Sequence, residues 1–112
     1  MIQRSLFEQP LRPVIAVQHA PDETADDRFR NWLSANPHVL DAFIGLALQA
    51  KQRGRTRIGA KLIVERLRWE YMIQTGGDEF RLNNNYTSRL ARAAVGSRPE
   101  LEPLFEFREL RS

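Results

Sequence analysis

The sequence has no cysteine and only two histidines among its 112 residues. The absence of cysteine excludes disulfide bonds, thiolate zinc sites and cysteine nucleophiles. The two histidines, His19 and His38, lack the spacing of three or four residues that places two metal ligands on one helical face. We therefore expect no metal site and no cofactor.

Long apolar runs are also missing. No stretch approaches the roughly 18 apolar residues of a membrane-spanning helix, and residues 1–10 lack the apolar block of a signal peptide. We therefore expect a cytoplasmic location and no membrane partner. Hydrophobic residues nevertheless make up 42% of the chain, which is enough to build the core of one small domain.

Patterns typical of enzymes are scarce. The sequence shows neither a Ser-His-Asp arrangement nor a glycine-rich phosphate loop. The adjacent acids Asp26 and Asp27 would point in different directions on a helix, which makes them a poor catalytic pair. Residues 76–80 spell the Gly-Gly-Asp-Glu-Phe signature of diguanylate cyclases, but the residues before them have a helical pattern and the chain is shorter than that catalytic domain. We interpret them as a turn, and expect no catalytic activity and no small-molecule substrate.

Positive charge is concentrated in one part of the chain. The formal net charge is +3, whereas residues 51–68 carry seven basic side chains against Glu65 alone. These are Lys51, Arg53, Arg55, Arg57, Lys61, Arg66 and Arg68. A localised basic block is typical of proteins that bind a polyanion, most often nucleic acid, and also of ordinary solubilising surfaces.

Helical patterns begin after an arm. Residues 1–25 are rich in proline and show no helical stripe, so we expect an extended arm that is mobile or holds a partner subunit, with one short strand at residues 12–17. Residues 26–112 are expected to form a single helical domain. One helix is predicted to start near Thr24. A second is predicted to cover residues 37–52, with Asn36 as its cap and Pro37 in its first turn. Gly54 is expected to provide a left-handed cap.

The third predicted helix, residues 60–73, is apolar on two sides. A helical wheel places Leu62, Trp69, Met72 and Ile73 on one face, and Ile63, Val64, Leu67 and Tyr71 on the other. A helix that is apolar on two sides is normally packed on two sides. We therefore expect this helix to form the centre of the domain, with its second face against a later helix or a partner chain.

A fourth helix is predicted for residues 86–95, ending at Gly96, and one further turn through Leu101. Leu104 to Leu110 alternates apolar and charged residues, which predicts a strand, and Ile58 is a candidate for pairing with it. The fold class is therefore mainly α with a minor β component, with about four helices. A winged-helix or helix-turn-helix arrangement is the working hypothesis for it.

The fourth helix follows three asparagines and carries polar and basic side chains opposite its apolar stripe. In a helix-turn-helix protein the start of the second helix meets the bases, and asparagine and arginine pair with adenine and guanine. The candidate base-contacting residues are Asn83, Asn84, Asn85, Thr87, Ser88, Arg89 and Arg92. The candidate phosphate-contacting residues are Lys51, Arg53, Arg55, Arg57 and Lys61. Two other interpretations stay open: the asparagines cap the helix, or the second and third helices form the motif.

One spaced pattern carries a resemblance. ERLRWE at residues 65–70, FRLNNNYTSRLAR at 80–92, PEL at 99–101 and FEFR at 105–108 are similar to segments of a family of small bacterial and phage proteins without an established activity. The resemblance covers about residues 29–110 and implies a phage or mobile-element origin.

The sequence thus favours a small DNA-binding protein, a phage-type transcription regulator with double-stranded DNA as its partner. The alternative is an adaptor, inhibitor or assembly factor that binds a protein partner, or forms a homodimer, through its apolar helix faces.

Overall fold

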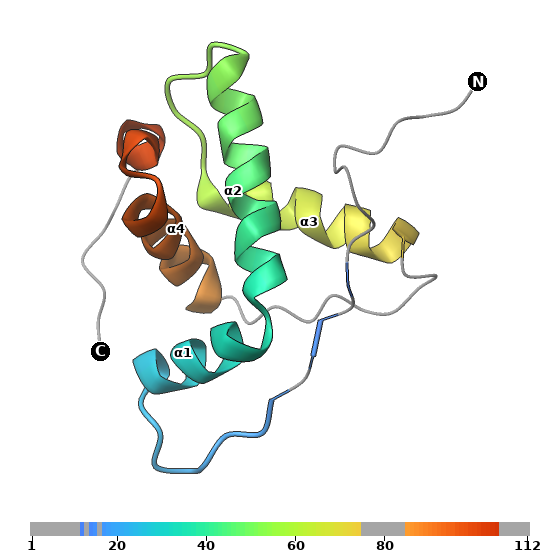
Figure 1. Cartoon of the computed structure of the whole chain (residues 1–112), viewed down its shortest axis with the longest axis vertical. Coiled ribbons are helices and arrows are strands. Elements are labelled where there is room, and N and C mark those ends of the chain that lie inside the picture. Colours follow the sequence, from blue (N-terminus) through green and yellow to red (C-terminus); the bar gives the residue numbers. More distant parts are fainter. Residues whose placement is uncertain (1–11, 13, 16, 75–84, 106–112) are drawn as a thin grey trace.

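Helices make up the domain in the computed structural model, which describes residues 12, 14–15, 17–74 and 85–105 (Figure 1). In chain order they are α1 (Ala25–Ala35), α2 (Pro37–Gln52), α3 (Ala60–Gln74), α4 (Asn85–Ser97) and the 3-10 helix η1 (Pro99–Leu104). In Figure 1, α4 starts beside α1 and runs alongside α2, while α3 crosses α2. The prediction of a mainly helical small domain is confirmed.

Local sequence signals set the helix ends. The Thr24 side chain accepts a hydrogen bond of 3.1 Å from the backbone N–H of Asp27, and Pro37 occupies the first turn of α2, where a missing N–H is harmless. At the other end of α2, Gly54 has a φ of 87°. The N–H of Gly54 donates to the carbonyl of Lys51, and that of Arg55 donates to Ala50. This pair of bonds is a Schellman motif, so the predicted left-handed cap is confirmed.

One face of α3 forms the centre of the core. Ile63, Val64, Leu67 and Tyr71 are buried, and α3 packs against both α2 and α4. The other apolar face of α3 is exposed among the described residues, so the expectation that a later helix covers it is wrong. Because α2 and α4 both approach from the same side, a single face of α3 serves both neighbours.

Aromatic rings join α1 to α4. Tyr86 lies edge-on to Phe29 at a centroid distance of 5.3 Å and contacts Trp32 at 5.1 Å. A second pair, Phe43 and Phe105, packs the end of η1 onto α2 at 5.7 Å. Such pairs contribute about 0.5–1.5 kcal/mol each beyond the burial of their area. The start of α4 is thereby fixed against α1.

The expected strands are not seen in the part of the chain that the structure describes. Leu104 belongs to η1 rather than to a strand, and residues 12–17 show no strand where they are described. Among the described residues, a backbone hydrogen bond of 2.8 Å from Ile58 N–H to the Leu104 carbonyl does join the two segments that were expected to pair. Helix α4 also continues through Gly96 to Ser97 instead of ending there.

Asn36 has a different role from the predicted one. Its side chain is fully buried and makes no capping bond to α2. Its Oδ1 accepts from the backbone N–H of Ile15 at 2.7 Å, and its Nδ2 donates to the carbonyls of Ile15 and Trp32 at 2.9 and 3.0 Å. The arm is therefore held against the junction of α1 and α2, where Val14 and Val17 also pack on the core.

We expect Asn36→Ala to destabilise the protein by about 2–3 kcal/mol, because it leaves the buried carbonyl of Trp32 and the partly buried backbone groups of Ile15 without their partners. The exposed amide of Gln18 provides the matched control, and Gln18→Ala should change stability by less than about 0.5 kcal/mol. Urea unfolding followed by circular dichroism measures both. Equal midpoints for the two variants would contradict the role assigned to Asn36.

Tyr71 should make stability fall at alkaline pH. Burial raises the pKa of its hydroxyl to about 12, whereas the unfolded chain titrates near pH 10. The unfolded state therefore loses its proton first, and stability falls as pH rises from about 10 towards 12. At pH 11 the loss from this group is about 1 kcal/mol. Urea titrations at pH 8 and pH 11 should show this difference between the natural chain and Tyr71→Phe, and an identical pH dependence would count against it.

Candidate nucleic-acid interface

Residues 51–61 form a strongly basic segment, here called the basic turn, which joins α2 to α3. It carries five cations and no acid. They are Lys51, Arg53, Arg55, Arg57 and Lys61, and all five are exposed. The segment ends at the first residues of α3, where the helix dipole adds a further positive potential. All five predicted phosphate-contacting residues therefore lie together on one exposed segment.

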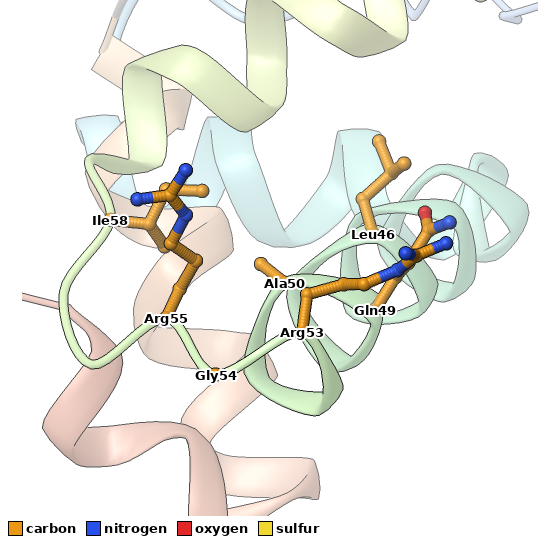
Figure 2. A pocket seen from close by; sticks show the side chains of 7 residues that line it. All are labelled: Leu46, Gln49, Ala50, Arg53, Gly54, Arg55 and Ile58. Atoms are coloured by element: carbon orange, nitrogen blue, oxygen red, sulfur yellow. The ribbon is translucent and has the colours of Figure 1, made fainter.

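The Schellman motif at Gly54 shapes this segment. It turns the chain so that Arg53 and Arg55 lie on either side of an open hollow of about 550 Å³. Figure 2 shows Arg53 extending beside Gln49 and Arg55 next to Ile58, with Ala50 between the two arginines and Leu46 above Arg53 and Gln49. The hollow is thus lined by the apolar side chains of Leu46, Ala50 and Ile58 together with Gln49 and the two arginines.

Contacts with η1 hold the basic turn in place. The Nζ of Lys51 donates to the carbonyl of Glu100 at 2.8 Å, and the Ile58–Leu104 bond fixes the other end of the segment. The Glu100 carboxylate pairs with Arg98 at 3.0 Å, and this hydrogen bond lowers its pKa. The negative charge beside Lys51 is therefore compensated by Arg98.

The candidate base-contacting residues are less uniform. Asn83 and Asn84 lie outside the described residues, and Asn85 is the first residue of α4. Thr87 and Ser88 are half-buried, and Arg92 is exposed. Only part of this group is therefore accessible to a ligand.

Arg89 does not face solvent. Its side chain is only 9% exposed, and its Nε lies 2.9 Å from the Oδ1 of Asp26 in α1. The expectation that Arg89 points away from the core is wrong, because the first turn of α1 covers that side of α4. An acid 63 positions away in sequence is the partner, and Arg89 links α4 to α1.

The predicted residues therefore fall into two regions. Arg89 marks the end of the molecule where α4 begins beside α1, whereas the basic turn lies beyond the far end of α2, next to η1 (Figure 1). Because α1 covers Arg89, this residue cannot form one continuous surface with the basic turn.

Two other kinds of feature are absent from the residues that the structure describes. These residues contain no group of three or more histidine, aspartate or glutamate side chains able to hold a metal ion. None of their helices has the length and apolar character needed to cross a bilayer. The cyclase-like residues 76–80 lie outside the described part of the chain.

Comparison of the chain with protein-family models, with curated proteins and with solved structures gave no match in any of the three. The resemblance to small bacterial and phage proteins therefore stays a prediction.

Sequence reasoning missed the lining of the hollow. Gln49 and Ala50 follow Leu46 by three and four residues, and Arg53 follows Ala50 by three, so helical periodicity alone places them on one side of the last turns of α2. Their meeting with Ile58 depends on the path of the chain after Gly54, which periodicity does not define.

We expect Arg89→Ala to lower the free energy of unfolding by about 1–2 kcal/mol, because it removes a buried side chain and its ion pair. Arg92→Ala, one helical turn further along α4, should change it by less than about 0.5 kcal/mol. A double-mutant cycle of Arg89→Ala with Asp26→Asn should give a coupling energy of about 1 kcal/mol. Solvent around the largely exposed Asp26 weakens the ion pair and keeps this energy small. A coupling near zero in thermal unfolding would argue against a structural ion pair.

Proposed function

We propose that this protein binds double-stranded DNA through the phosphate backbone, as a small regulator without chemistry of its own. The observation that carries the proposal is the basic turn, with five exposed cations, no acid and a position at the start of α3. Cations that replace condensed counterions supply most of the non-specific affinity of DNA-binding proteins. A surface of this kind fits the negative potential of a duplex.

The geometry of the turn supports contacts to several phosphates. Lys51 is held on η1, while Arg53 and Arg55 stand on either side of the hollow. Guanidinium groups bind phosphate oxygens through paired hydrogen bonds. The apolar lining between them suits the sugar of a bound nucleotide, so that a phosphodiester segment fits across the hollow.

Helix α4 has a smaller part in this proposal than in the original hypothesis. Arg92, Thr87 and Ser88 are the accessible members of the candidate base-contacting group, and Arg89 is assigned to the fold. In the winged-helix form of the proposal a strand follows α4. The extended backbone of Phe105 is compatible with the start of such a strand, whereas residues 106–110 lie outside the described chain.

The alternative motif, with α3 as the reading helix, is disfavoured. A reading helix presents polar and charged side chains to base edges. The exposed face of α3 instead carries Leu62, Trp69 and Ile73. This face favours a second candidate function, an adaptor or assembly factor that binds another protein.

Loss of two arginines tests the DNA proposal. We expect Arg53→Gln with Arg55→Gln to weaken binding to a random duplex by at least about tenfold and to reduce the slope of log K against log salt by about 2. Fluorescence anisotropy at several salt concentrations measures both quantities. Arg12→Gln with Arg30→Gln removes the same charge from exposed positions outside the basic block and should leave most of the affinity intact.

Equal losses for the two double variants would show that total charge, and not the basic turn, determines binding. If the natural chain is not retained on heparin at low ionic strength, the DNA proposal fails and the protein-binding candidate is preferred.

A further inference from the structure

Arg98 lies beside the basic turn, although the chain passes through α3 and α4 before it reaches this residue. The Nζ of Lys51 donates to the backbone carbonyl of Glu100 at 2.8 Å, and Arg98 donates to the carboxylate of the same Glu100 at 3.0 Å. Glu100 therefore connects the two cations. The side chains of Arg98 and Glu100 are 46% and 43% exposed, so a ligand can reach this position from solvent.

The Arg98 guanidinium holds the Glu100 carboxylate in a fork. Its Nη2 donates to Oε2 at 3.0 Å, and its Nε lies 3.3 Å from each of the two carboxylate oxygens. Two phosphate oxygens fit the same planar set of donors and carry the same sign of charge. The carboxylate of Glu100 thus occupies the position in which this guanidinium would bind a phosphate group.

Positive charge exceeds negative charge around this position. The hydrogen bond from Arg98 lowers the pKa of Glu100, and the charges of Arg98 and Lys51 lower it further. Two cations therefore act on one carboxylate. The ammonium group of Lys51 has three N–H donors, of which one is used on the Glu100 carbonyl, so Lys51 can bind a further anion without leaving η1.

We propose that Arg98 and Lys51 together bind one phosphate of DNA, and that this phosphate displaces the carboxylate of Glu100 from Arg98. The inference rests on the proposed DNA binding, and it extends the phosphate-contacting surface from the basic turn to the start of η1. Glu100 is then an internal competitor, which holds Arg98 in the free protein and lowers the affinity for DNA.

The ion pair is weak enough to be exchanged. Both of its side chains are solvated and lose rotamer freedom when they pair, so such an exposed pair contributes little to stability. A duplex that is already bound by the basic turn brings its phosphates to Arg98 at a high effective concentration. The carboxylate returns to water when it is displaced, where it is well solvated. The exchange therefore costs little and adds one phosphate contact.

Removal of the competitor should strengthen binding. We expect Glu100→Gln to raise the affinity for a random duplex by about three- to tenfold, because Arg98 becomes accessible and a negative charge leaves the contact. Glu102→Gln is the matched control. It removes the same charge from an exposed position of η1 that lies on a different side of this 3-10 helix, and should change the affinity by less than about twofold. Fluorescence anisotropy measures both, and equal effects of the two variants would overturn the proposal.

A second substitution separates a phosphate contact from simple neutralisation of charge. If Arg98 only neutralised Glu100, Arg98→Gln would have no effect in a chain that already carries Glu100→Gln. We expect instead that it weakens binding in that chain by at least about fivefold and reduces the slope of log K against log salt by about 1. Arg30→Gln in the same chain removes an exposed arginine of α1 and should leave both quantities nearly unchanged.

The outcomes distinguish this contact from the proposed function itself. If the natural chain binds the duplex but Arg98→Gln has no effect in the Glu100→Gln chain, the phosphate contact of Arg98 is overturned and the DNA proposal stands. If the natural chain does not bind the duplex at low ionic strength, both are overturned. All four substituted side chains are exposed, so each variant should keep the helical circular dichroism of the natural chain.

Discussion

The buried amide of Asn36 is the interaction on which the arrangement of the helices depends. It lies where α1 ends and α2 begins, and it satisfies backbone groups of Ile15 and Trp32 at the same time. A buried amide with such partners has few other acceptable positions, because an unpaired polar group in the core costs more than the bond contributes. The direction of α1 relative to α2 is thereby fixed. Tyr86 and Arg89 then position α4 against the helix that this junction has placed.

Helix ends and faces were predictable from sequence because they depend on neighbouring residues. Thr24 accepts a hydrogen bond from a nearby backbone N–H, Pro37 lacks an N–H where the helix needs none, and Gly54 adopts the left-handed conformation that ends α2. Periodicity also separated the two faces of α3. Which of these faces is covered depends on elements far along the chain. The sequence pattern was the same for a face that is buried and for one that meets solvent, so the second apolar face of α3 was recognised but its exposure was not.

The candidate site shows the same division. The basic turn was predictable because a run of cations without acids has little alternative to solvent. Arg89 has the same chemistry as Arg92, one turn away on the same helix, yet only Arg89 is covered. The difference is made by Asp26, which no local pattern connects with α4. Asn36 was misread for a related reason: its position suits a cap, but the extended arm beside it offers better partners.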